Sequence, residues 1–156
     1  MDRLRRDQEG FTLVELMIVL LVIGILVAIG LPVFLGAKIR ADERRTQAEL
    51  RTGLIAGLTY WADRGDFTGF AANCTAVADS CTAADGSESA LVWVGPGQPG
   101  IAQESIVVAS GANLLLTART SAGEFFCIAQ SSGQTDHGRG VAFSDIDTMP
   151  ECTGGW

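Results

Sequence analysis

The residue with the clearest capacity for chemistry is a carboxylate at the start of a long apolar run. Residues 10–32 read GFTLVELMIVLLVIGILVAIGLP, and Glu15 is the only charged side chain between Gly10 and Lys38. An ionised carboxylate at mid-bilayer costs about 2.5–3.5 kcal/mol on insertion scales. Such a charge is tolerable in an apolar setting only with a partner, so Glu15 predicts either a specific interaction or a side chain that snorkels to the membrane interface.

The apolar run predicts a membrane-spanning helix rather than a conventional secretory signal. About 20 apolar residues suffice to cross a bilayer, and this run is that long. A secretory signal has a shorter apolar stretch followed by a small-residue cleavage site. Here the glycine that could mark a cut, Gly10, precedes the run instead.

Helical periodicity continues beyond the apolar run. We expect one helix from about Thr12 to about Ala62, with a stop at Gly65, since strand signals are few and apolar residues recur at helical spacing. The predicted sheet-facing stripe consists of Leu50, Leu54, Leu58 and Trp61, with Ile55 and Ala62 beside them. A kink or local break is expected at Pro32, helped by Gly24 and Gly30, because proline removes a backbone hydrogen bond and glycine weakens helices.

These features together resemble the N-terminal signature of type IV pilins and the related pseudopilins. The resemblance rests on a short leader ending in Gly10, on Phe11 as the new first residue, on Glu15 as the fifth and on Pro32 as the twenty-second. It implies that a membrane-embedded prepilin peptidase cuts between Gly10 and Phe11 and methylates the new amine. It also implies that the N-terminal helices of many identical subunits pack into a filament core.

The resemblance gives Glu15 a physical role. Cleavage creates a second charge in the apolar core, the amine of Phe11, and a neighbouring subunit's amine is a candidate partner for the carboxylate. Such a pair would fix the axial register, because sliding one helix past another strands both charges. The alternative is a glutamate that snorkels at the end of a simple membrane anchor.

The remainder of the chain predicts a small antiparallel sheet. Short apolar runs at 90–94, 105–110, 114–120 and 124–130 give about four strands, and the SAG sequence at 121–123 is typical of a hairpin loop. Residues 66–89 and the glycine-rich 131–140 are expected to be loops, the latter leading to VAFSDI and the tail. The predicted fold class is therefore α+β: a long N-terminal helix, half transmembrane and half amphipathic, packed on a small type IV pilin-like antiparallel head.

The four cysteines predict disulfides and an oxidising compartment for the head. An even number in a small exported domain is typical of disulfide bonds, and no tight C-x-x-C pair suggests zinc. We favour Cys74–Cys81 and Cys127–Cys152, while the crossed pairings remain open. In the resembled family, a disulfide-bound C-terminal loop is commonly exposed on the filament surface. Export of the head leaves the N-terminus in the cytoplasm.

Charge and residue types give little support for catalysis or nucleic-acid binding. Residues 63–156 hold eleven acidic side chains against three arginines, which opposes binding to phosphate backbones. His137, the only histidine, is expected to be a solvated loop residue. Asp145 and Asp147 have a fragment of calcium-ligand spacing, but a solvent-facing acidic turn is favoured over a metal site. No cofactor and no enzymatic activity are expected.

The sequence thus predicts a pilin organised as a removed leader (1–10), a filament-core helix (11–37), an amphipathic helix (38–62) and a disulfide-stabilised head (63–156). Its expected partners are identical subunits in a helical homopolymer, the prepilin peptidase and an inner-membrane assembly machinery. Before assembly it would be a single-pass membrane protein, and afterwards part of an extracellular pilus. The alternatives are a type II secretion pseudopilin and a membrane-anchored binding protein with an unrelated head.

Overall fold

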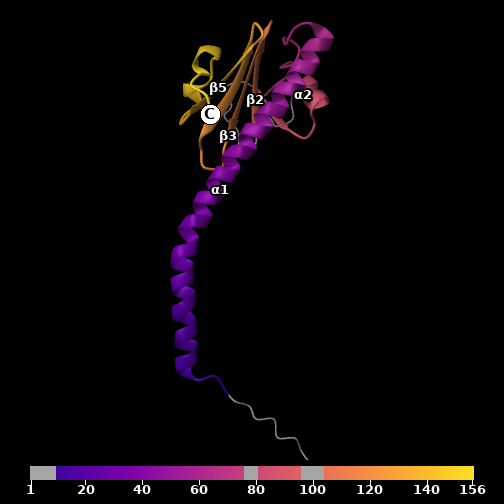
Figure 1. The fold of residues 1–156 in the computed structure, drawn as a ribbon. Coiled ribbons are helices and arrows are strands. Elements are labelled where there is room, and N and C mark those ends of the chain that lie inside the picture. Colours follow the sequence, from indigo (N-terminus) through magenta and orange to yellow (C-terminus); the bar gives the residue numbers. More distant parts are fainter. Residues whose placement is uncertain (1–9, 76–80, 96–103) are drawn as a thin grey trace, which may run out of the picture. The chain divides into compact units, whose positions relative to one another are not determined.

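The computed structural model of the chain describes residues 10–75, 81–95 and 104–156, and the chain divides into two compact units, residues 1–38 and 39–156. The described elements are α1 (Leu13–Arg64), α2 (Thr82–Ser87), β1 (Val92–Val94), β2 (Glu104–Ser110), β3 (Asn113–Arg119), β4 (Phe125–Ser131), β5 (Gln134–Gly140) and the 3-10 turns η1 (Phe143–Asp145) and η2 (Met149–Glu151) (Figure 1). The predicted α+β class is confirmed.

Helix α1 closely follows its predicted bounds. It stops where Gly65 adopts a left-handed φ of +81° and donates its N–H to the Trp61 carbonyl at 2.6 Å. Only glycine adopts this conformation without steric cost, so the stop signal is local. The helix runs unbroken through Pro32, so the predicted local break is absent, while a kink there stays a prediction.

The second unit, residues 39–156, is built on a five-stranded sheet in the order β1-β2-β3-β4-β5. Strands β2, β3 and β4 are antiparallel neighbours, as predicted, with the SAG hairpin between β3 and β4, and β5 adds an unpredicted antiparallel strand beside β4. Strand β1 differs from the expectation, because it pairs parallel to β2 with Val94 opposite Ile106.

Two segments expected to be loops are regular structure. Residues 134–140 form β5, which follows a two-residue turn in which Ser132 and Gly133 have φ values of +48° and +84°. Two consecutive positive φ values are typical of a tight type I′ hairpin, so this turn supplies the connection. The expected loop at 66–89 contains the short helix α2, and the VAFSDI segment that follows β5 contains the 3-10 turn η1.

The sheet has a hydrophobic core on each face, because alternate residues of β3 and β4 point to opposite sides. The helix-side core joins Leu50 of α1 to Leu114, Leu116, Phe126 and Trp93. On the other face, Leu115, Phe125 and Cys127 pack with Ile146 and Cys152 of the C-terminal segment. Both central strands are therefore almost entirely buried, which explains their unbroken apolar runs.

The face of α1 that contacts the sheet is only partly the one predicted, since Leu50 is buried in the core and Leu54 packs against it, whereas the other predicted residues are exposed. Its buried residues are Thr46, Leu50, Gly53, Ala56 and Gly57. Leu54 is partly buried, while Leu58, Trp61 and Ile55 are 38%, 44% and 64% exposed and Ala62 is exposed as well. The glycines decide the orientation, because a Cβ on Gly53 would lie 3.1 Å from Leu116 Cδ1 and from Trp93 Cη2. The helix therefore approaches the sheet through its smallest residues.

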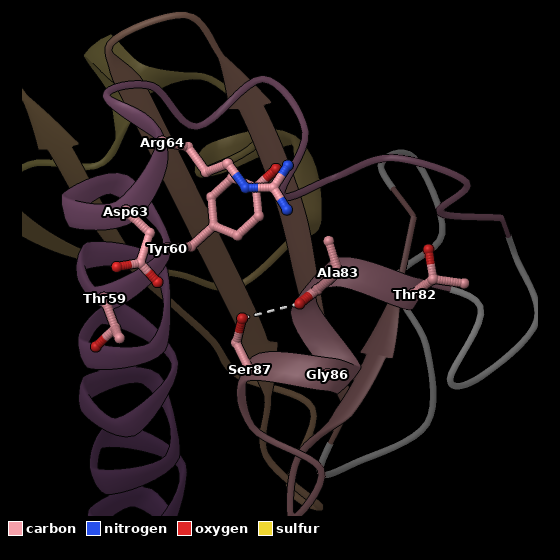
Figure 2. A pocket seen from close by; sticks show the side chains of 8 residues that line it. All are labelled: Thr59, Tyr60, Asp63, Arg64, Thr82, Ala83, Gly86 and Ser87. Atoms are coloured by element: carbon pink, nitrogen blue, oxygen red, sulfur yellow. Dashed lines mark hydrogen bonds between the residues drawn. The ribbon is translucent and has the colours of Figure 1, made fainter.

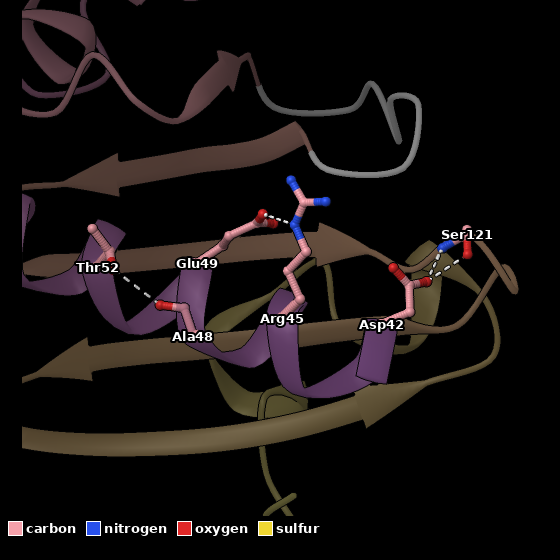
Figure 3. Close-up of polar contacts among 6 residues, drawn as sticks. All are labelled: Asp42, Arg45, Ala48, Glu49, Thr52 and Ser121. Carbon is pink, nitrogen blue, oxygen red and sulfur yellow. Dashed lines mark hydrogen bonds and ion pairs between the residues drawn. The ribbon is translucent and has the colours of Figure 1, made fainter. Parts of the chain in front are cut away.

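A polar contact ties this part of α1 to the far end of the β3–β4 hairpin. The carboxylate of Asp42 accepts hydrogen bonds from the backbone N–H and the hydroxyl of Ser121 at 2.7 and 2.6 Å (Figure 3). Nearby on the helix surface, Arg45 and Glu49 form an ion pair, with 2.8 Å between Arg45 Nε and Glu49 Oε1. Asp42 therefore marks the end of the head at which the hairpin turns.

Replacing Gly57 by alanine tests the close approach of helix and sheet. The new Cβ would overlap the buried Leu114 side chain, so overpacking should lower the free energy of unfolding by about 1–3 kcal/mol, despite alanine's better helix propensity. The measurement is thermal unfolding of the detergent-solubilised chain, followed by near-UV circular dichroism. Gly86→Ala in α2, where the new Cβ meets nothing within 4 Å, should be neutral or slightly stabilising. Equal stability of the two variants would contradict this packing.

Candidate assembly site

The first unit presents an apolar helical surface that its own chain leaves uncovered. Its large apolar side chains from Phe11 to Leu35 are 48–83% exposed. Within the described residues, α1 is one helix long and apolar enough to cross a membrane, with a mean hydropathy of 3.1 over its most apolar 18 residues. An apolar surface this large marks a site of contact with lipid or with other proteins.

Glu15 and Thr12 form a reciprocal cap at the start of α1. The Glu15 oxygen Oε2 accepts hydrogen bonds from the Thr12 backbone N–H at 3.0 Å and from its hydroxyl at 2.9 Å. In return, the Glu15 backbone N–H donates to the Thr12 hydroxyl oxygen at 3.2 Å. This is a capping box, in which N-cap and third residue satisfy each other's backbone donors. The T-x-x-E pattern of residues 12–15 is the sequence signal of this capping box, and the box was not among the predicted features.

The cap leaves half of the carboxylate available. Both contacts from Thr12 are to Oε2, and among the described residues no group bonds the other oxygen, Oε1. The cap also fixes the direction of the carboxylate, because the Thr12 hydroxyl and backbone hold it from two sides. Glu15 can therefore accept a further charged donor without losing its role at the helix start.

The predicted cleavage position lies just outside the helix. Gly10 is exposed and without regular structure, and a Cβ built on it would meet nothing within 4 Å. Phe11 follows with 83% of its surface exposed. An extended, accessible peptide bond is what a peptidase requires, so the geometry is compatible with a cut here. Residues 1–9 of the predicted leader lie outside the described residues.

The cysteines form two disulfides, Cys74–Cys81 and Cys127–Cys152. The second joins β4 to the C-terminal segment that covers one face of the sheet. From Cys152 the tail continues along β5, where Gly154 bridges Gly138 and the Gly155 N–H donates to the His137 carbonyl at 2.8 Å. Gly138 permits this approach, since a Cβ there would lie 2.8 Å from the Thr153 backbone nitrogen.

His137 is a packed strand residue rather than the solvated loop residue that we expected. Its ring meets Trp156 edge to face, with centroids 4.6 Å apart. The Trp156 indole donates to the Cys127 carbonyl at 2.9 Å, and the Arg51 guanidinium lies 5.0 Å from its ring centre. The histidine therefore contributes to packing between the tail and the sheet.

The two aspartates considered as weak calcium candidates are engaged separately. Asp145 Oδ2 accepts the backbone N–H groups of Val141 and Ala142 at 3.0 and 2.9 Å. Partial burial raises the pKa of Asp147, and a hydrogen bond and negative charge from Glu151 add to the rise. Within the described part of the chain, no three acidic, histidine or cysteine side chains gather as metal ligands would.

An open polar hollow of about 430 Å³ lies between the end of α1 and α2 (Figure 2). Tyr60, Asp63 and Arg64 line it from the helix, and the guanidinium of Arg64 sits 5.2 Å from the Tyr60 ring centre. The Ser87 hydroxyl is used in a bond to the Ala83 carbonyl at 2.9 Å. The lining holds no imidazole or thiol.

The N-terminal segment matches a known family. Residues 5–31 fit the family model described as the prokaryotic N-terminal methylation motif. The chain therefore carries the N-terminal methylation motif of prokaryotic prepilins. The prepilin motif includes Gly10, Phe11 and Glu15 and ends one residue before Pro32.

Curated relatives share the prepilin motif and its continuation. The chain is 33% identical over 70 residues to the type IV major pilin protein PilA of Myxococcus xanthus (strain DK1622), covering 45% of this chain and 32% of that one. It is 47% identical over 49 residues to the type IV major alpha-pilin of Moraxella bovis, covering 31% of each. It is 37% identical over 46 residues to the type II secretion system core protein G of Aeromonas hydrophila, covering 30% of this chain and 32% of that one. The matched region thus spans about a third of each relative, and no solved structure gives a significant match.

Replacing Thr12 tests the cap that orients Glu15. Thr12→Val keeps the shape but removes the hydroxyl, which should cost about 1 kcal/mol at the helix start and free the carboxylate to rotate. Amide hydrogen exchange of the mature chain in detergent micelles should show faster exchange in the first turn of α1. Thr12→Ser, which retains the hydroxyl, is the matched control and should exchange like the parent. Unchanged exchange in Thr12→Val would mean that the cap does not hold Glu15.

Proposed function

We propose that this chain is the structural subunit of a type IV pilus filament. The observation that carries the proposal is that the prepilin motif at residues 5–31 coincides with the start of an exposed apolar helix. A helix whose apolar side chains stay exposed in the single chain needs lipid before assembly and other subunits afterwards. The pilin relatives support the same function for a chain that shares their N-terminal region.

In this proposal, residues 1–10 are a leader that a prepilin peptidase removes before methylating Phe11. Residues 11–37 then cross the inner membrane with the N-terminus on the cytoplasmic side, while the head lies beyond it. An inner-membrane machinery transfers the subunit from the bilayer into an extracellular helical homopolymer. The two disulfides support an oxidising location for the head.

Glu15 would direct assembly in this filament. Its Oε2 is held by Thr12, so the free Oε1 can receive the methylated amine of Phe11 from a neighbouring copy. Two opposite charges in an apolar core stabilise only one alignment of the helices, because any slip leaves both unpaired. The pair therefore selects register. Pro32, with Gly24 and Gly30, would let the helix bend or loosen as it packs.

A second candidate function is that of a pseudopilin in a type II secretion system. The relative from Aeromonas hydrophila supports it, since that core protein G shares the same N-terminal region. Electron microscopy of surface filaments, followed by mass spectrometry of their main subunit, separates the candidates. A long surface filament built from this chain supports the pilin, whereas a cell without such filaments supports the pseudopilin.

Processing gives the first test of the proposal. The mature chain should begin at Phe11 and carry one added methyl group on its amine, because Gly10 leaves the backbone open to the peptidase. Intact-mass measurement of the subunit from the membrane or from filaments checks this. A mature chain that begins at Met1, or after residue 30, would contradict it.

Glu15 variants test the charge pair. Glu15→Val should abolish filaments, because removing one side of a buried pair typically costs about 3–5 kcal/mol, and the cost recurs at every subunit. Glu15→Gln should also impair assembly, although glutamine can keep the capping box with Thr12. Glu15→Asp, with its shorter reach, should be intermediate. Filaments are counted after membrane insertion and leader removal have been verified.

The glutamine variant separates two roles of the residue. If Glu15 acted only as a helix cap, Glu15→Gln would assemble like the parent chain while Glu15→Val would not. Normal filament numbers from Glu15→Val would falsify the pairing altogether and favour a simple membrane anchor.

A further inference from the structure

In the second unit, residues 39–156, few of the described large apolar side chains are exposed. One of them is Ile39, at the point where α1 enters the second unit. The others are Ile55, Leu58 and Trp61 on the last turns of α1, and Val141 after β5. The other large apolar residues of residues 39–75, 81–95 and 111–156 are buried or half-buried. These two places, the end of α1 and Val141, therefore require an explanation.

The end of α1 borders an open hollow of about 290 Å³, which we call the end hollow. It is lined by Leu58, Trp61, Phe67, Ala112, the amide residue Gln130 and the Ser132–Gly133 turn. No charged side chain lines it, and its floor is the buried ring of Phe67. The turn on its rim is a tight hairpin turn with positive φ at Ser132 and Gly133. The hollow is present in the single chain, as is usual for binding sites that are formed before a partner binds.

The other exposed apolar residue projects from a pinned turn. Val141 is 83% exposed, and one carboxylate oxygen of Asp145 holds both its N–H and that of Ala142. Gly140 lies against the same side chain, since a Cβ there would sit 2.6 Å from Asp145 Cβ. The valine is therefore presented on a rigid support, and little conformational entropy would be lost if a partner covered it.

The end hollow and Val141 lie at opposite ends of the head. Strand β5 leads from the Ser132–Gly133 turn to Val141 through seven residues, or about 24 Å at 3.4 Å per residue. Gly140 pairs with Phe125 beside the β3–β4 hairpin, the end marked by the Asp42–Ser121 contact (Figure 3). Leu58 is 16 residues beyond Asp42 on α1, again about 24 Å. The two features thus cannot meet within one chain.

We propose that the end hollow of one copy receives Val141 of the next copy in the filament. This inference rests on the proposed filament function. A contact between two different surfaces of identical chains repeats without closing when its rotation does not return to the start, and it then builds an open helix. A two-fold dimer with antiparallel heads could also seat each Val141 in the other copy's hollow, but that contact closes on itself and cannot continue along a filament.

Electrostatics favours this contact over others on the head. The region from residue 63 onward carries a formal charge of −8, so two heads repel each other at most orientations. Neither the lining of the end hollow nor the Gly140–Ala142 turn contains a charged side chain. Docking there removes mainly apolar surface from water, and the nearest carboxylate, that of Asp145, already has one oxygen bonded to the backbone of the Val141 turn.

A charge pair introduced across the contact tests the proposal. Val141→Asp should lower the number of filaments per cell about tenfold or more, because a carboxylate would enter an apolar hollow. Adding Ala112→Lys to the same chain should restore most of them, since residue 112 of one copy would then face residue 141 of the next. Ser144→Asp adds the same charge to the same exposed loop, and it should leave the count unchanged.

Folding and processing are verified on the same samples. Val141 is 83% exposed, so Val141→Asp should keep the near-UV circular dichroism, both disulfides and the methylated Phe11 of the parent. Val141→Thr, which keeps the branched shape and adds one hydroxyl, should give a smaller loss of filaments. Normal filaments from Val141→Asp would overturn the inference, and so would a loss that Ala112→Lys fails to restore.

Cross-linking reads the geometry directly. Filaments of the Ala112→Cys and Val141→Cys double variant, treated with a short bismaleimide, should give a ladder of covalent multimers, whereas either single variant should stay monomeric. Filaments without a ladder would overturn the contact while the proposed function stands. A parent chain that keeps Met1 and forms no filaments would instead overturn the proposed function, and this inference with it.

Discussion

An apolar helical surface that the single chain cannot cover is the constraint on which the rest of the protein depends. From Phe11 to Leu35 the large side chains are exposed, so this segment is stable only in lipid or among other apolar helices. The only charged group within it, Glu15, must therefore be satisfied by its surroundings. Thr12 bonds one oxygen of this carboxylate, and within the described residues the other oxygen has no hydrogen-bond partner.

The features that the sequence predicted well are those with local signals. The extent of α1 follows from periodicity and from Gly65, the β3–β4 hairpin from SAG, and the apolar segment from composition alone. The prepilin motif depends only on the spacing of residues 5–31, so it can be recognised in the sequence without knowledge of the fold. The capping box is equally local, since the T-x-x-E pattern of residues 12–15 is its signal, and it gives Glu15 a second role beside its charge.

What could not be predicted depends on contacts between distant parts of the chain. Strand β5 has almost no apolar residue, and it is a strand because the Ser132–Gly133 turn folds it back onto β4. The predicted sheet-facing side of α1 was right at Leu50 and wrong nearer the helix end, because periodicity favours the largest side chains, whereas Gly53 and Gly57 let the backbone come closest. That preference exists only once Leu114 and Leu116 of the sheet are opposite them.

The pairing of the C-terminal tail with β5 affects whether the protein aggregates at high local concentration. Open strand edges recruit further strands, which is the usual route to amyloid-like aggregation. Here one edge of the sheet is the three-residue strand β1, and the other is partly capped by the Gly138–Gly154 bridge. Many copies can therefore be crowded together while backbone-to-backbone association is discouraged. Any ordered polymer must then be held by side chains, whose contacts can be reversed, rather than by a continuous β-ladder.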